Sequence, residues 1–183
     1  MRKDYFDIFD AISFTVRTLK DRDDDFGRPL IMHAMALVGL ARDEDEFITA
    51  LLFYCTTKWV PSLESIERRP VDREIIRAVR LMQLNTDDHI PDPLRHRIDG
   101  IKRDATSEYP DTKLAGELAI TTFCRYIALE EKRLLSDIAR FESRHVNNLK
   151  YQKIIQRCRS SLRSVQSEKD RLVHAFGKEP FKL

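Results

Sequence analysis

The chain has 183 residues, of which 42% are hydrophobic and 34% are charged, so it is long enough for one well-packed domain and too apolar for a disordered protein. Its 32 Lys and Arg nearly balance 30 Asp and Glu, which argues against a non-specific nucleic-acid binder, because such proteins need clustered positive charge. No segment approaches the roughly 18 apolar residues of a membrane span, and the first residues lack the apolar core of a signal peptide.

The three cysteines are far apart in the sequence and have neither the C-x-x-C spacing of a metal site nor the even number of a disulfide framework. They are Cys55, Cys124 and Cys158. We expect buried, reduced thiols and therefore a cytoplasmic protein that does not associate with a membrane.

Helical periodicity of apolar residues runs through almost the whole chain, and only 5 Gly and 7 Pro interrupt it. The first helix, over 5–19, has an apolar stripe of the kind that packs on a core, formed by Tyr5, Ile8, Phe9, Ile12, Val16 and Leu19. Further helices are expected over 29–41, 43–57, 61–69, 73–84, 93–106 and 112–129, and then two charged helices from 131 that meet near 143–148.

This pattern predicts an all-α protein with one multi-helix domain over residues 1–183. Core helices would occupy about 4–130 and C-terminal helices about 131–178. The segment 47–57, "FITALLFYCTT", is apolar nearly all round, so we expect it at the centre of the core.

Two loops are rich in possible metal ligands, but neither has the pattern of a metal site. In the acidic loop from Asp21, Phe26 and Met32 occupy the positions where an EF-hand needs Gly and Glu, so a solvated loop is the better interpretation. The second loop could bind a transition metal in principle, although its prolines oppose convergence of the ligands, which would be Asp87, Asp88, His89, Asp92 and His96.

Basic residues recur along the last helix, at Arg157, Arg159, Arg163, Lys169 and Arg171. Glu168 and Asp170 are interleaved with them, so we interpret this face as solvated rather than as a phosphate-binding strip.

Three segments, "GRPLIMH" (27–33), "TALLFYCTTK" (49–58) and "TKLAGEL" (112–118), together resemble the HD-domain family in their order and spacing. The resemblance is to the hydrolase domain of RelA/SpoT-type (p)ppGpp enzymes and their small stand-alone relatives. The closing segment 151–176 is similar to the terminal helices of the stand-alone enzymes, so the resemblance covers nearly the whole chain. The matching residues are Gly27, Pro29, Ile31, His33, Ala50, Leu51, Leu52, Lys113, Leu114, Ala115 and Leu118.

The resemblance implies an HD-like helical bundle, but most of the family's metal ligands are replaced in this chain. Phe53 and Tyr54 stand where the family has His and Asp, Thr57 and Lys58 replace its Glu-Asp pair, and Gly116 replaces its last Asp. Of the four metal ligands only His33 remains. A single imidazole does not replace the hydration shell of a divalent cation, so we expect no bound metal, no cofactor and no catalytic residue.

These substitutions favour a catalytically degenerate HD-fold protein that acts as a regulatory or protein-binding module, through a protein partner or self-association. The degenerate cleft would include Arg28, His33, Tyr54 and Lys58. Arg28 and Lys58 could meet the phosphates of a guanine nucleotide, whereas the acidic run before them would repel a polyphosphate.

Two alternatives remain open. One is an active, Mn-dependent (p)ppGpp or nucleotide pyrophosphohydrolase with a rearranged site, in which Asp87, Asp88 or His89 joins His33. The other is an unrelated helical scaffold.

Overall fold

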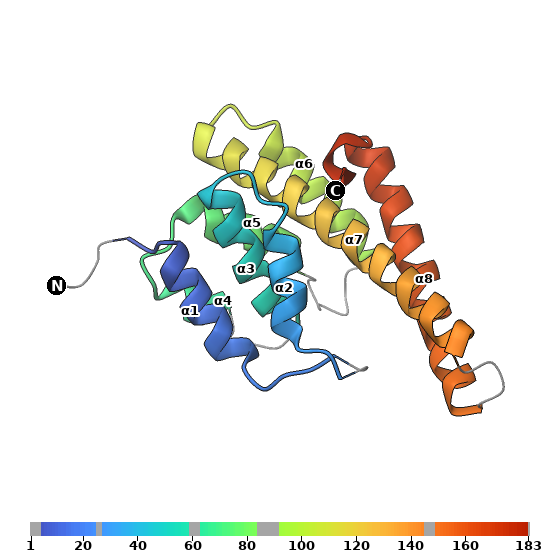
Figure 1. Ribbon diagram of the computed structural model, residues 1–183. Coiled ribbons are helices and arrows are strands. Elements are labelled where there is room, and N and C mark those ends of the chain that lie inside the picture. Colours follow the sequence, from blue (N-terminus) through green and yellow to red (C-terminus); the bar gives the residue numbers. More distant parts are fainter. Residues whose placement is uncertain (1–4, 25–26, 59–62, 84–91, 145–148, 183) are drawn as a thin grey trace. The chain divides into compact units, whose positions relative to one another are not determined.

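The computed structural model describes residues 5–24, 27–58, 63–83, 92–144 and 149–182, apart from the side chains of residues 57, 58, 144 and 150. Among these residues it has eight α-helices and no strand, which confirms the all-α prediction (Figure 1). None of the helices described has the length and apolar character needed to cross a bilayer. The helices are α1 (Ile8–Leu19), α2 (Leu30–Val38), α3 (Glu44–Lys58), α4 (Leu63–Glu67), α5 (Arg73–Met82), α6 (Pro93–Ala105), α7 (Pro110–Arg144) and α8 (Leu149–Phe176), and a 3-10 turn (Glu179–Phe181) follows them.

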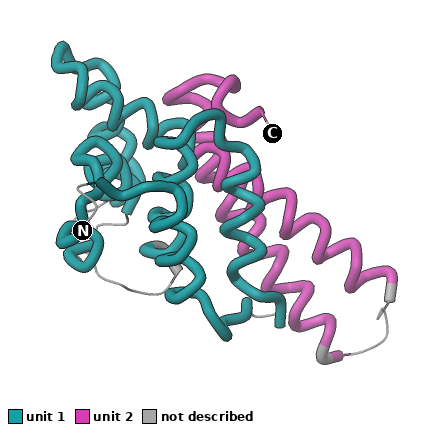
Figure 2. Tube along the Cα trace, turned by 60° about the vertical axis from the view of Figure 1, so that its left-hand side comes forward, with its two compact units in different colours: residues 1–123 teal, residues 124–183 magenta. Residues whose placement is uncertain are grey.

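The chain divides into two compact units, residues 1–123 and 124–183 (Figure 2). The division falls inside α7, which continues without a break through residue 131, so the prediction of a separate helix beginning there is wrong. The reason is local: neither Gly nor Pro occurs between residues 117 and 144, and nothing in that stretch ends a helix. That residues 1–183 act as a single domain stays a prediction.

Helix α3 is the centre of the first unit, as its apolar sequence predicted. It packs against α1, α2 and α5, and all residues over 48–55 are buried. Side chains define where it starts, because Asp43 accepts a hydrogen bond from the Glu46 backbone N–H at 2.9 Å. The carboxylate of Glu46 in turn accepts one from the backbone N–H of Arg42 at 2.8 Å. Acidic side chains therefore satisfy N–H groups at this helix end.

The buried face of α1 shares only Leu19 with the predicted stripe. Phe9 is 75% exposed and Val16 47%, and Tyr5, just before the helix, is 62% exposed. The buried residues of α1 are Ala11, Phe14, Thr15 and Leu19.

The buried face of α1 was predicted wrongly for a physical reason. Apolar residues cover more of the helix circumference than the core can bury. Phe14 and Ala11 extend the apolar surface on the other side of Leu19, and contact with α3 selects that side. Thr15 can be buried there because its hydroxyl donates to the carbonyl oxygen of Ala11 at 2.8 Å and accepts from the Cys55 thiol at 3.5 Å.

Close contact between α6 and α7 depends on Gly116. A Cβ atom at this position would lie 2.2 Å from the backbone N of Ala105 and 2.6 Å from its Cα. Phe123, the last residue of the first unit, makes two ring contacts: with Phe53 at a centroid distance of 6.2 Å and with the Arg97 guanidinium at 4.6 Å. A glycine and an aromatic ring thus hold α7 in this unit.

The second unit is an antiparallel pair formed by the C-terminal part of α7 and by α8. Glu131 is paired with Lys169 at 2.5 Å, and Glu142, further along α7, is paired with Arg159 at 2.6 Å. Between the two helices the apolar contacts include Phe141 and Tyr151, whose ring centroids are 5.7 Å apart.

We expect Gly116→Ala to lower the free energy of unfolding by about 1–3 kcal/mol, because the added methyl group would overlap the backbone of Ala105. Gly100→Ala is the matched control, since its Cβ would meet only Leu81 at 3.6 Å, an ordinary contact, and should stabilise α6 by up to about 1 kcal/mol. Urea denaturation followed by circular dichroism measures both. Equal stability of the two variants would contradict the close approach of α6 and α7.

Candidate functional site

Two of the predicted site residues, Arg28 and His33, meet at the carboxylate of Asp24. The Oδ2 atom of Asp24 accepts from Arg28 Nε at 2.8 Å and lies 2.7 Å from Arg28 Nη2. His33 Nε2 lies 3.1 Å from the same oxygen. The side chains of Asp24, His33 and Arg28 are 8%, 16% and 29% exposed, so the group is largely shielded from water.

A tight turn of the backbone positions this cluster at the start of α2. The backbone N–H of Arg28 donates to Asp24 Oδ1 at 3.0 Å, and that of Asp24 donates to the Arg28 carbonyl at 2.8 Å. Gly27 closes the turn with a φ of +73°, in the left-handed region that favours glycine. The glycine and proline around Arg28 therefore set the geometry that brings the carboxylate to His33.

Chemically, the cluster is a set of ionic and hydrogen-bonding contacts through which Asp24, in the turn, interacts with Arg28 and with His33 on α2. The oxygen of Asp24 that faces His33 also receives the Arg28 guanidinium, and a cation at this oxygen would meet that positive charge. Among the described residues, no three His, Cys, Asp or Glu side chains come close enough together to hold a metal ion.

The other positions singled out by the HD resemblance are packing positions where the structure describes them. Phe53 and Tyr54 are buried in α3, and Gly116 faces the backbone of Ala105. The side chain of Lys58 lies outside the described residues, as does that of Thr57. These positions thus supply aromatic rings and a bare backbone, neither of which is a donor set for a divalent cation.

The sequence pattern predicts a solvated acidic loop around Asp24 and does not identify Asp24 as part of this cluster. That interpretation is right for Asp21 and Asp23, which are exposed, and wrong for Asp24. The available signal was an Asp and an Arg four residues apart on either side of a glycine, a spacing that suits a carboxylate folded back on a turn.

The loop that could supply metal ligands, residues 85–93, lies mostly outside the described residues. Asp87, Asp88 and His89 lie outside the described residues. Asp92 is the N-cap of α6 and accepts from the backbone N–H of Arg95 at 3.0 Å, while His96 is exposed on the first turns of that helix. Asp92 therefore has a structural role in capping a helix.

The cysteines are free and buried, as predicted. Burial raises the pKa of Cys55 to about 11 and that of Cys124 to about 12. These thiols are protonated at neutral pH and do not act as nucleophiles there.

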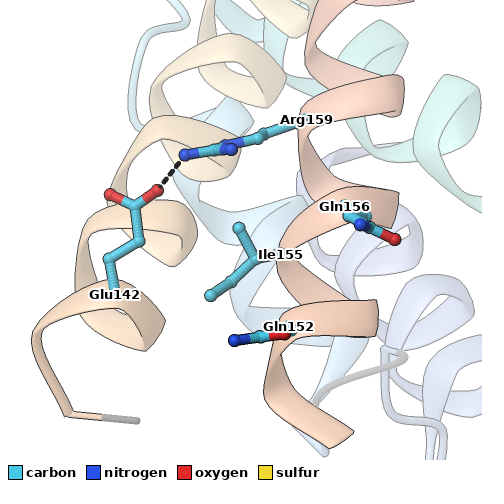
Figure 3. A pocket seen from close by; sticks show the side chains of 5 residues that line it. All are labelled: Glu142, Gln152, Ile155, Gln156 and Arg159. Atoms are coloured by element: carbon cyan, nitrogen blue, oxygen red, sulfur yellow. Dashed lines mark hydrogen bonds and ion pairs between the residues drawn. The ribbon is translucent and has the colours of Figure 1, made fainter. Parts of the chain in front are cut away.

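A separate hollow lies in the second unit between α7 and α8. Its volume is about 280 Å³, and it is lined by Glu142, Gln152, Ile155, Gln156 and Arg159 (Figure 3). The sequence pattern predicts a solvated face on this part of α8 and gives no sign of the hollow.

No family model matches this chain, and neither a curated protein nor a solved structure is significantly similar to it. The resemblance to the HD-domain family stays a prediction that rests on the residues quoted above.

Proposed function

We propose that this chain is a catalytically silent, HD-like helical protein of the cytoplasm that acts as a regulatory or protein-binding module. One observation supports the loss of catalysis most directly. The positions where the resemblance would require metal ligands, Phe53, Tyr54 and Gly116, are committed to packing. Restoring a carboxylate at residue 116 would force it into the backbone of Ala105.

The surroundings of His33 also oppose metal binding. Its Nε2 atom is engaged with Asp24, and Asp24 is engaged with Arg28. A divalent cation would have to displace the guanidinium and find further oxygen or nitrogen ligands before it could activate water. The described residues around His33 do not fit a metal centre.

Nucleotide binding is also disfavoured by the same cluster. The guanidinium of Arg28 is held by Asp24 through two nitrogen atoms, so a phosphate would compete with a shielded carboxylate for the same donors. This leaves a protein partner as the better proposal.

Exposed apolar side chains on the first unit favour such a partner. Phe9 and Val16 lie two turns apart on one edge of α1, beside the half-buried Ile12. Met32 and Met35 are exposed on α2. Large apolar side chains gathered on a surface are typical of protein-binding sites, and we propose that the α1 edge pairs with a second copy of the chain.

The catalytic part of the proposal is tested by a pyrophosphohydrolase assay with (p)ppGpp and Mn²⁺, together with metal analysis of the purified protein. We expect metal well below one equivalent and no turnover above the buffer rate. His33→Ala should change neither value. Stoichiometric metal and a turnover that His33→Ala abolishes would contradict the proposal and establish the rearranged enzyme instead.

The binding part is tested by light scattering over a range of protein concentrations. We expect the unaltered chain to dimerise, and Phe9→Ser with Val16→Ser to shift it to the monomer, because the substitutions remove the exposed apolar edge. Tyr109→Ser, which removes an exposed aromatic ring elsewhere, is the control and should leave the dimer intact. A chain that stays monomeric at all concentrations, or a dimer that tolerates the double substitution, would refute self-association through α1.

A further inference from the structure

The near-neutral charge of the whole chain conceals two oppositely charged units. Residues 1–123 contain 18 Lys and Arg against 23 Asp and Glu, a net charge of −5. Residues 124–183 contain 14 Lys and Arg against 7 Asp and Glu, a net charge of +7. The overall balance that argued against nucleic-acid binding therefore does not hold for the second unit.

Within the second unit, the positive charge is concentrated on the first two thirds of α8. No Asp or Glu occurs between residues 149 and 167, whereas this stretch has five Lys and Arg. Glu168 and Asp170, which suggested an interleaved solvated face, both lie beyond it. The exposed side chains are almost all basic, amide or hydroxyl: Gln152, Lys153, Gln156, Arg157, Arg159, Ser160, Ser161, Arg163, Ser164 and Ser167.

Helical geometry divides these basic residues into two rows. With about 100° per residue, Arg159 and Arg163 share one side of α8, and Lys153 and Arg157 share another about 120° away. Gln156, Ser160 and Ser167 lie between the two rows. Two cationic rows that flank a polar strip can contact phosphates on both sides of a groove while the strip faces its floor.

The Arg159 row borders the hollow between α7 and α8. Figure 3 shows Arg159 reaching from α8 toward Glu142 on α7, with Ile155 between the helices. The Arg159–Glu142 pair is 2.6 Å long and lies on the surface, where Arg159 is 61% exposed. A second, more open hollow continues along the same row to Leu162 and Arg163. Arg159 is thus held in place by one contact while most of its surface stays open to a ligand.

We propose that this face of α8, from Lys153 to Ser167, binds the phosphate backbone of duplex nucleic acid. The exposed side chains of this face favour duplex nucleic acid over three other ligands: a protein, a membrane surface and a single-stranded nucleic acid. A protein interface needs apolar and aromatic anchors, and a membrane surface needs a strongly apolar helix face, whereas the exposed residues from 152 to 167 include neither. A single strand needs aromatic side chains for base stacking, and none is exposed on this stretch.

The size of the face fits a short duplex site. Fifteen residues, 153–167, extend about 22 Å along the helix axis, or about six to seven base pairs at 3.4 Å per pair. Four described basic side chains could neutralise about four phosphates, which gives a slope near −4 for log K against log salt concentration. This inference is independent of the HD resemblance and of dimerisation through α1.

Fluorescence anisotropy with labelled 20-base-pair DNA and RNA duplexes tests the proposal on the full chain between 50 and 200 mM salt. We expect saturable binding to at least one duplex, with a salt slope near −4. The triple substitution Lys153→Gln, Arg157→Gln and Arg163→Gln should weaken binding at 50 mM salt at least tenfold and reduce the slope by about 2–3, because three phosphate contacts are lost. Arg159 is kept so that Glu142 retains its partner.

A control variant removes the same charge from exposed positions of the first unit, through Arg17→Gln, Lys20→Gln and Lys102→Gln. It should bind within about twofold of the unaltered chain, which separates a located site from a general charge effect. Thermal denaturation checks that the variants fold, and Arg157→Gln alone, expected to reduce the slope by about one, serves if the triple variant does not.

Three results would overturn the proposal: no saturable binding to either duplex at 50 mM salt, an equal loss in the control variant, or competition by poly-glutamate as strong as by unlabelled duplex. The last result would assign the face to an acidic protein. Preference for the DNA or the RNA duplex supports the proposal in either case and identifies the groove geometry that the face fits.

Discussion

Burial of α3 is the constraint on which the rest of the first unit depends. Eight consecutive residues of this helix are buried, and α1, α2 and α5 pack around it. A helix in this position has no side left for a water-filled site, so Phe53 and Tyr54 contribute to the core whatever chemistry their positions have in other proteins. The same constraint acts on α7, where Gly116 and Phe123 are required for contact with α6 and α3.

The remaining polar cluster near this core has a consistent physical interpretation. Asp24 is shielded from water, and a shielded carboxylate needs charged or hydrogen-bonding partners, which Arg28 and His33 provide. The imidazole of His33 is therefore a hydrogen-bonding partner of the Asp24 carboxylate, and this contact connects the turn to α2. An interpretation of His33 as the remnant of a metal site agrees with this arrangement but is not required by it.

Much of the fold could be predicted from the sequence because helical periodicity and the scarcity of Gly and Pro act locally. The central place of α3 followed from its apolar residues. The buried side of α1 did not, because Phe9 and Phe14 are equally apolar and only contact with α3 decides between them. Asp24 was missed for a similar reason. The loop has four acidic residues, and only the turn and the partner side chains, which a sequence pattern does not contain, distinguish Asp24 from the others. The net charge of the whole chain also gave a wrong impression of its surface, because the negative charge of the first unit and the positive charge of the second unit nearly cancel in the sum.

The surfaces proposed for binding differ in kind and belong to different units. The α1 edge exposes apolar side chains, whereas α8 exposes basic, amide and hydroxyl groups. We propose that aromatic rings and a glycine contact occupy the positions where a cation site would need its ligands, and that His33 binds no metal ion. Crystals grown with Mn²⁺ and measured at the manganese absorption edge test this proposal. We expect no anomalous peak within coordination distance of His33 and an intact Asp24–Arg28 pair. A peak bound by His33 and at least two other side chains would contradict it.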